Sequence, residues 1–231
     1  MPNRKFFDLY ITYSPDNVRE MILLTKHLGY SGVCIEIDPQ HFRDLENLEL
    51  EINRIKKFAN NIGVDVFFRT DASVKHDTLK KLAGLIRILS INVTSDTEFR
   101  VALRNKFANV ISCDMKTCCQ ILSPELINLL HQFRGKYVEM RLSHFLKLSP
   151  IEKGLILSQF YRRKNLFNKE KFPLIISSGA QKPSELMSPR CVRSFLRLIG
   201  FTEKKILEAL SENPAKLINL PWDVILLEQG D

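Results

Sequence analysis

Seven short apolar runs alternate with segments of helical periodicity over most of this 231-residue chain. Most of these runs are rich in β-branched and aromatic residues and are nearly continuously apolar, as strands covered on both faces are. Parallel strands joined by helices form either a doubly wound sheet or a β/α barrel. Seven strands in regular succession favour the barrel. The expected strands are Phe6–Ile11, Gly32–Ile37, Val64–Arg69, Ile86–Val93, Asn109–Cys113, Tyr137–Leu142 and Phe172–Ser177.

Proline marks where the intervening helices begin. Five Ser-Pro or Asn-Pro pairs place an N-cap residue directly before Pro at the first helical position. Ser149 also has Glu152 three residues later, which is the spacing of a capping box. The five pairs predict helix starts at Ser14-Pro15, Ser123-Pro124, Ser149-Pro150, Ser188-Pro189 and Asn213-Pro214.

The end of the chain departs from this regular alternation. After Gly200 the pattern predicts a helix over Thr202–Ser211 and a short helix from Pro214, with no eighth strand. No linker or internal repeat divides the chain. We therefore expect a single domain over residues 1–231, an α/β fold that forms a distorted TIM-like (β/α) barrel with about seven clear strands and an irregular helical C-terminal end.

Positive charge is concentrated in one stretch of the sequence. The chain has a net charge of +8, and residues 129–205 carry 16 Lys and Arg against 5 Asp and Glu. Such a field suits a polyanionic partner, either nucleic acid or an anionic membrane surface. The alternative is a solvated surface that keeps the protein soluble. No apolar run reaches the ~20 residues that span a bilayer, so we expect no membrane-spanning segment.

Metal-ligand patterns are weak. The five His residues show no spacing typical of a metal site, and the cluster of Cys113, Cys118 and Cys119 has no second cysteine pair. An odd number of cysteines in a chain of this size predicts an intracellular protein whose thiols are reduced and mostly buried, Cys34 and Cys191 included. We therefore expect this chain to bind no metal or other cofactor.

Acidic side chains follow two of the expected strands. Glu36 and Asp38 end the second strand, and Asp71 follows the third. Catalytic acids of β/α barrels lie at such strand ends. Salt bridges or helix caps are the interpretation that we favour, because no His or second motif accompanies these carboxylates.

The segment Ser188–Gly200 predicts an amphipathic helix with a basic stripe. Arg190, Arg193 and Arg197 recur at one face, and Arg is the side chain best suited to bidentate phosphate contacts. Just before it, an expected strand runs into Ser177, Ser178 and Gly179. This sequence indicates either a loop that approaches a phosphate closely or a tight turn of small residues.

A second basic group comprises Arg162, Arg163 and Lys164 at the end of the Pro150 helix. Cations there also suit the helix dipole, so a structural role is an open alternative. Three aromatic residues nearby would suit either stacking on unpaired bases or the protein core: Phe160, Tyr161 and Phe167. Arg69 and Arg141 end strands, so we expect both to point at the barrel mouth.

The C-terminal third resembles a known family. Its matching elements run in order from the strand into Ser177-Ser178-Gly179-Ala180, through Glu185-Leu186, Ser188-Pro189-Arg190 and Leu198-Ile199-Gly200-Phe201, to Ala209-Leu210-Ser211-Glu212-Asn213-Pro214. At the start, Phe7-Asp8-Leu9 and Gly29-Tyr30-Ser31-Gly32 fit as well. With these motifs the chain resembles the ribonuclease P protein component 3 family, the barrel subunit of archaeal and eukaryotic ribonuclease P. Tyr10, where relatives often have His, and Met187, where a basic residue often stands, depart from the family pattern.

The resemblance implies a role in removing the 5′ leader of precursor tRNA. It implies that the RNA subunit carries the chemistry with Mg²⁺, and that this chain binds and stabilises that RNA together with another small protein subunit. It also implies a cytoplasmic location, or a nuclear one in a eukaryote. Two other functions remain open: a metal-dependent phosphoesterase-like barrel enzyme, and a scaffold that binds mainly a protein partner.

The predicted RNA-binding residues combine the basic groups with the small-residue loop. Arg190 and Arg193 rank first, because they lie on the expected helix that carries the basic stripe. We expect no catalytic residue in this chain. The remaining predicted RNA contacts are Arg197, Ser177, Ser178, Gly179, Arg69, Arg141, Arg162, Arg163 and Lys164.

Overall fold

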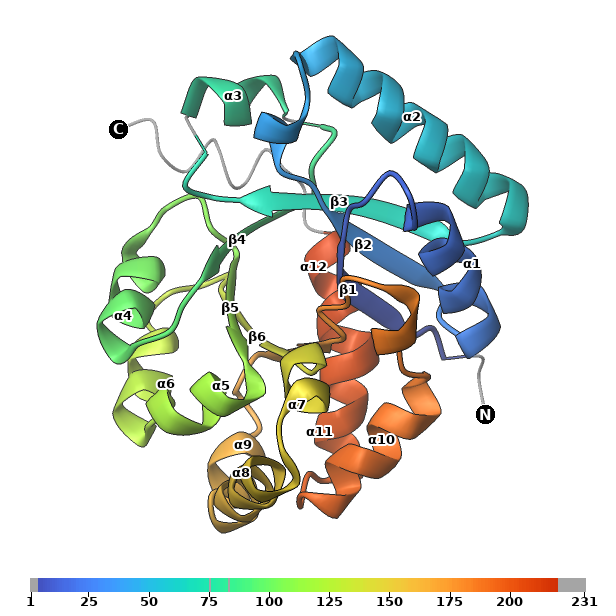
Figure 1. The fold of residues 1–231 in the computed structure, drawn as a ribbon. Helices are drawn as coiled ribbons and strands as arrows, with labels where there is room; N and C mark the ends of the chain where they lie inside the picture. Colours follow the sequence, from blue (N-terminus) through green and yellow to red (C-terminus); the bar gives the residue numbers. More distant parts are fainter. Residues whose placement is uncertain (1–3, 75, 83, 220–231) are drawn as a thin grey trace.

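Seven parallel strands form the one sheet of the computed structural model, which describes residues 4–74, 76–82 and 84–219. They are hydrogen-bonded in sequence order from β1 to β7. Every strand lies where the sequence predicted it, within a few residues, and the TIM-like barrel is confirmed (Figure 1). The strands are β1 (Phe7–Thr12), β2 (Gly32–Glu36), β3 (Asp65–Asp71), β4 (Ile88–Asn92), β5 (Val110–Asp114), β6 (Tyr137–Arg141) and β7 (Leu174–Ser177).

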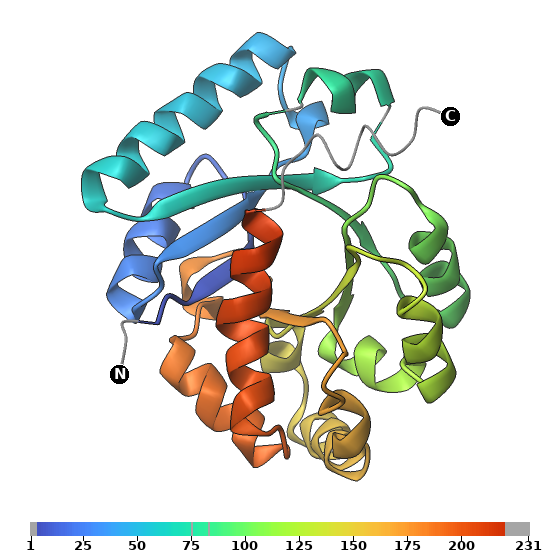
Figure 2. The same cartoon turned by 180° about the vertical axis from the view of Figure 1, so that it is seen from behind.

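Helices connect successive strands and form the outer layer of the barrel, as the two opposite views show (Figures 1 and 2). Three short helical turns add to them: η1 (Pro39–His41), η2 (Pro183–Glu185) and the π-helical η3 (Glu208–Glu212). The helices are α1 (Val18–Leu28), α2 (Leu45–Ile62), α3 (His76–Lys81), α4 (Asp96–Arg104), α5 (Met115–Ile121), α6 (Pro124–Leu130), α7 (Ser143–Lys147), α8 (Pro150–Arg162), α9 (Lys164–Phe167), α10 (Pro189–Leu198), α11 (Glu203–Leu207) and α12 (Asn213–Ile218).

The barrel is closed by the chain that follows β7. Backbone N–H of Thr12 donates to Ala180 O at 2.8 Å, and that of Gly179 donates to Tyr10 O at 3.0 Å. Beneath this seam η3 and α12 pack against both β1 and β7. The described part of the chain therefore has seven strands and a helical end, as the sequence predicted.

Three of the five predicted N-caps are confirmed. Ser123, Ser149 and Ser188 each accept a hydrogen bond from the backbone three residues on, and Ser149 forms the full capping box with Glu152. Ser14 instead begins a turn, and α1 starts only at Val18.

Asn213 lies inside a continuous helical path rather than at a cap. Its side-chain amide donates to Leu174 O at 2.8 Å on the neighbouring strand. A proline in a helix lacks its N–H and clashes with the preceding turn. The wider π-helical turn η3 directly precedes Pro214 and gives the helix the room to continue through it.

The cysteines correct part of the sequence-based expectation. The structure joins Cys113, at the end of β5, to Cys118 on α5 in a disulfide whose Cα atoms are 5.8 Å apart, a normal separation for such a bond. Cys34 and Cys119 are buried thiols as predicted, whereas Cys191 is exposed. The turn from β5 into α5 brings the pair together, which residue spacing alone does not show.

The barrel interior has two chemically distinct levels. Its lower level, at the start of the strands, is apolar and is closed from below by α12. The residues of this cluster are Phe7, Leu9, Cys34, Ile88, Val110, Ile175, Leu217 and Ile218. The next inward-facing positions along the strands are polar, and they lead to the mouth of the barrel.

Candidate functional site

A buried ion pair occupies the polar level inside the barrel. Arg69 on β3 has no exposed surface, and its Nη1 donates to both carboxylate oxygens of Glu139 on β6, at 2.8 and 2.9 Å. Glu139 also accepts the hydroxyls of Ser112 at 2.6 Å and Ser177 at 2.7 Å. The two interior charges are therefore paired, as buried charges must be, although Arg69 Nε and Nη2 have no acceptor among the described residues.

Tyr10 covers this ion pair from the side of the mouth. The Arg69 guanidinium carbon lies 4.2 Å from the centroid of the Tyr10 ring. The Tyr10 hydroxyl donates to Glu36, and burial, with the nearby Glu36 charge, raises the pKa of Tyr10 well above its usual value. The expectation that Arg69 points at the barrel mouth and contacts RNA is therefore wrong, because the side chain lies beneath Tyr10.

The loop after β7 serves barrel closure. The Ser177 hydroxyl is bound to Glu139, and the Ser178 hydroxyl donates to Tyr10 O at 3.1 Å. Both serines are buried, so neither hydroxyl is available to an RNA. The prediction of direct RNA contacts by Ser177 and Ser178 is thus contradicted, and the alternative of a tight turn applies.

Asp8 is a buried carboxylate at the same seam. Its Oδ1 accepts the Ser178 backbone N–H at 3.0 Å, whereas its Oδ2 has no partner among the described residues. Burial raises the pKa of Asp8 to about 6, although the hydrogen bonds from Ser178 oppose the shift. The sequence marked this strand but not the unusual environment of its carboxyl group.

The acidic residues at the strand ends have structural partners. Glu36 accepts the Tyr10 hydroxyl, Asp38 caps η1, and Asp71 accepts the Ser73 backbone N–H at 2.8 Å. Within residues 4–74, 76–82 and 84–219, no three His, Cys, Asp or Glu side chains gather so as to hold a metal ion. The interpretation of these carboxylates as salt bridges or helix caps is confirmed for Asp38, whereas Glu36 and Asp71 have other local partners.

The basic stripe lies on α10 as predicted, beside a surface groove of about 480 Å³. Arg190, Arg193 and Arg197 line one side, and Phe6 and Gly29 lie among the groove's other lining residues. Arg190 is exposed and forms no ion pair with any described residue. The stripe therefore presents at least one free guanidinium to solvent.

One acidic residue, which the prediction of a basic stripe did not include, pairs with two of the three stripe arginines. Glu203, at the start of α11, pairs with Arg193 at 2.5 Å through one oxygen and with Arg197 at 2.6 Å through the other. Burial opposes ionisation of Glu203, but the hydrogen bonds from Arg197 and Arg193 outweigh it and lower its pKa. The sequence contained a clue to this pairing, because Glu203 follows the end of the arginine-bearing helix by only a few residues.

The family model "RNase P subunit p30" matches residues 5–220 of the chain. The chain belongs to the RNase P subunit p30 family. Among curated relatives, ribonuclease P protein component 3 of Methanosarcina mazei is 24% identical over 221 residues, covering 94% of this chain and 90% of the relative. The Methanopyrus kandleri protein of the same name is 28% identical over 206 residues, covering 86% and 84%. The resemblance deduced from the motifs is thereby confirmed.

Solved structures support the same fold. A chain from the cryo-EM structure of an archaeal ribonuclease P with mature tRNA superposes with a TM-score of 0.72 at 18% identity, covering 97% of this chain and 94% of that one. A probable 2-pyrone-4,6-dicarboxylic acid hydrolase from Acinetobacter baumannii gives 0.55 at 13% identity, covering 94% and 100%. In the described part of this p30-family chain, no helix is both long and apolar enough to cross a membrane.

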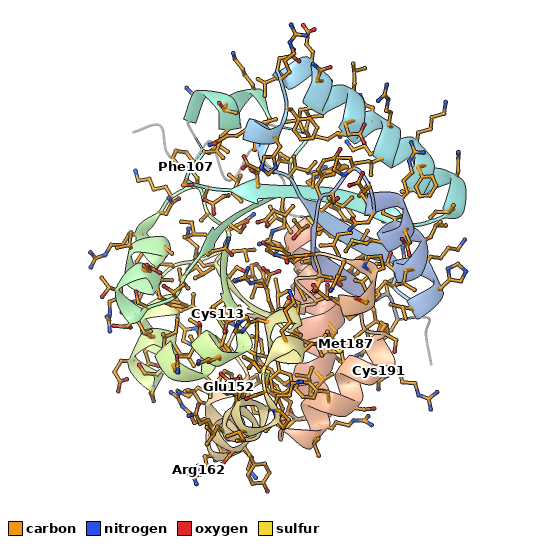
Figure 3. The ribbon with its side chains drawn as sticks, viewed as in Figure 1. Phe107, Cys113, Glu152, Arg162, Met187 and Cys191 are labelled. Atoms are coloured by element: carbon orange, nitrogen blue, oxygen red, sulfur yellow. A yellow bond between two sulfur atoms is a disulfide. The ribbon has the colours of Figure 1, made fainter. Side chains whose placement is uncertain are left out.

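The second basic group of the p30-family chain has mixed roles. Arg163 donates to the backbone carbonyls of Cys119 and Leu122, so it closes the C-terminal end of α5. Arg162 is exposed and projects from the end of α8 (Figure 3). Lys164 lies 4.3 Å from the centroid of the exposed Tyr161 ring. RNA contact by this group stays a prediction for Arg162 and Lys164, whereas Arg163 is held by the protein.

The aromatic residues beside this group also divide. Phe160 and Phe167 are buried core residues with ring centroids 4.6 Å apart. Tyr161 is 55% exposed. Tyr161 is thus accessible for stacking on a base, whereas the two buried phenylalanines are not.

Proposed function

We propose that this chain is a protein subunit of ribonuclease P, which binds and stabilises the catalytic RNA that cleaves the 5′ leader from precursor tRNA. The observation that carries the proposal is the p30 family match over residues 5–220. The groove on α10 supplies a surface suited to the task, since it combines guanidinium groups with exposure. On this proposal the chain belongs to an endoribonuclease without being its catalyst.

The work of the chain would be electrostatic. RNA strands that crowd around an active centre repel each other through their phosphates, and cations on a rigid support relieve that repulsion. Arg190 and Arg193 lie one helical turn apart on α10, whose N-terminus is fixed by the Ser188 cap. We propose that the chemistry needs Mg²⁺ held by the RNA, and that bound protein lowers the Mg²⁺ concentration required.

Partners complete the proposal. We infer that the chain acts beside another small ribonuclease P protein, in the cytoplasm or, in a eukaryote, the nucleus. The metal-dependent phosphoesterase alternative lacks support, because it needs three ligands at strand ends and the carboxylates there are engaged otherwise. The scaffold alternative predicts RNA binding that does not depend on α10.

The test replaces Arg190 and Arg193 together by Ala. The fold should persist, because both side chains lie at the surface and Arg190 has no partner to lose. Affinity for the ribonuclease P RNA should fall, and the slope of log affinity against log salt should shrink by about 1 to 2, since each lost phosphate contact removes roughly 0.7–0.9. Reconstituted precursor-tRNA cleavage should then need more Mg²⁺.

A matched control removes two exposed arginines from the opposite, acidic part of the chain. Arg43 and Arg54 belong to residues 1–77, which carry 10 Lys and Arg against 12 Asp and Glu. Their replacement by Ala changes the net charge equally and should leave the salt slope unchanged. An unaltered slope in the Arg190 and Arg193 variant would remove α10 from the RNA interface.

A further inference from the structure

The mouth of the barrel contains an arginine without a partner. Among the described polar residues there, Glu36 accepts the Tyr10 hydroxyl and Lys147 pairs with Glu185 at 2.9 Å. Arg141, at the end of β6, makes no hydrogen bond or ion pair with a described residue, and its Nε is shielded from solvent without an acceptor. Buried donors are normally satisfied, and Arg141, unlike Arg69 with its own unmet N–H groups, lines a pocket that an acceptor from outside the chain can enter.

Arg141 lines a small, partly open pocket of about 190 Å³. Lys147 and His144 also line it. Its single carboxylate is Asp114, whose two oxygens accept the backbone N–H and the hydroxyl of Thr117 at 2.8 and 3.1 Å. The lining cations Arg141 and Lys147 outnumber the one carboxylate, although Lys147 is paired with Glu185 outside the pocket, and the pocket is smaller than the cavities of about 300–1,000 Å³ that enclose drug-sized ligands. A compact anion fits this combination.

The fold holds the Arg141 side chain in place. Gly179 has a φ of +66°, and a Cβ built on it would lie 3.0 Å from Arg141 Cβ and 3.2 Å from its Cδ. The aliphatic stem thus occupies space that only a glycine leaves free. On its other side the guanidinium carbon lies 5.3 Å from the Tyr10 ring centroid. Arg141 therefore fills the space that the missing Cβ of Gly179 leaves.

We propose that this pocket, defined by Arg141, His144, Lys147 and Asp114, binds a phosphate group. The planar fork of Arg141 suits bidentate phosphate contact, and Lys147, half-exposed at the rim, can add a second cation by exchanging its partner Glu185 for the phosphate. Because the pocket is small, it takes the end of a ligand rather than a continuous strand. The phosphate belongs either to a free nucleotide or to the 5′ terminus of an RNA. The proposal does not depend on the α10 groove.

Calorimetric titration tests this site on the intact chain. The probes are inorganic phosphate, adenosine 5′-monophosphate, and a short RNA with either a 5′-phosphate or a 5′-hydroxyl. Arg141→Gln should weaken binding of the phosphate probes about tenfold or more, because a charge-assisted hydrogen bond is lost. Arg43→Gln removes the same charge from an exposed position outside both the pocket and the α10 groove, and it should leave the affinity unchanged. Arg141→Lys, which keeps the charge, should recover part of the affinity.

The outcomes separate the ligand sources. Tighter binding of the 5′-phosphorylated RNA than of its hydroxyl form, lost in Arg141→Gln, assigns the site to an RNA end. Binding of the nucleotide with no difference between the RNAs assigns it to a free nucleotide. If no probe binds at millimolar concentration, or if Arg141→Gln binds as the wild type does, the proposal fails.

Two controls keep the result interpretable. Thermal unfolding midpoints of the Gln and Lys variants should match the wild type, because Arg141 makes no bond that the fold loses. Affinity for the ribonuclease P RNA measured in the Arg190 and Arg193 variant reports on the proposed function alone. The phosphate-site proposal can therefore be rejected while the proposed function is supported, or the reverse.

Discussion

Arginines inside the barrel and arginines on α10 carry the same charge in opposite settings. Arg69 is fully buried and bonded to Glu139, whereas Arg193 and Arg197 share Glu203 with side chains that are 33% and 55% exposed. A low dielectric strengthens the interior pair and shields it from salt. Water and ions weaken the surface fork, which adds little to stability. The exterior arginines can therefore exchange partners, and the interior one cannot.

The largest expected effect comes from breaking the interior pair. Glu139→Ala leaves Arg69 buried without its carboxylate, which should lower the free energy of unfolding by about 3–5 kcal/mol. Urea denaturation measures the loss. Glu203→Ala is the matched surface variant and should cost no more than about 1 kcal/mol. Equal losses at the two sites would erase the contrast between interior and surface.

Asp8 gives the interior a pH dependence opposite in sign to that of the surface fork, because the pKa of Asp8 is raised whereas that of Glu203 is lowered. Because its pKa rises from 3.8 to about 6 on folding, the protonated acid is favoured in the folded state. The resulting stabilisation is complete below pH 3.8 and is lost as the pH rises through about 6, a change of ~3 kcal/mol.

Asp8→Asn isolates this contribution, since the amide cannot titrate and its oxygen still accepts from Ser178. Urea denaturation at pH 4 to 8 gives the free energy of unfolding of the wild type and of Asp8→Asn. The wild-type value minus the variant value should decline as the pH rises. A difference that is flat across this range would show that Asp8 is not protonated in the folded protein.

The smallest expected effect concerns the surface fork. Glu203→Gln frees Arg193 and Arg197 for phosphates, so RNA affinity at low salt should rise several-fold and the salt slope should steepen by about 1 to 2. Glu170→Gln, which breaks the neighbouring exposed pair with Lys204, makes the same charge change. Equal tightening by both variants would reveal a general field effect rather than competition by Glu203.

The order of elements was predictable because it depends on local pattern. Apolar runs marked all seven strands, and Ser-Pro pairs marked the starts of α6, α8 and α10. The burial of Arg69 was not predictable, since its partner Glu139 lies 70 residues away and no local signal links the two residues. A strand-end arginine looks the same in sequence whether it faces the mouth, as Arg141 does, or lies one level deeper.

The candidate site was predicted in part for the same reason. The stripe on α10 follows from helical periodicity and is in place. Its neutralisation by Glu203 depends on how α11 folds back beside α10, which periodicity does not encode. Ser177 and Ser178 resembled a ligand loop because small polar residues suit both phosphate contact and a seam between two strands.

The packing of η3 and α12 under β1 has a consequence for how the protein is made. The Ser211 hydroxyl donates to Lys5 O at 2.6 Å across a sequence separation of 206 residues. Strand β1 therefore acquires its lower neighbours only after the chain has been synthesised through η3 and α12. Until then the apolar face of β1 that η3 and α12 cover stays exposed. Such long-range closure slows folding and exposes nascent chains to aggregation.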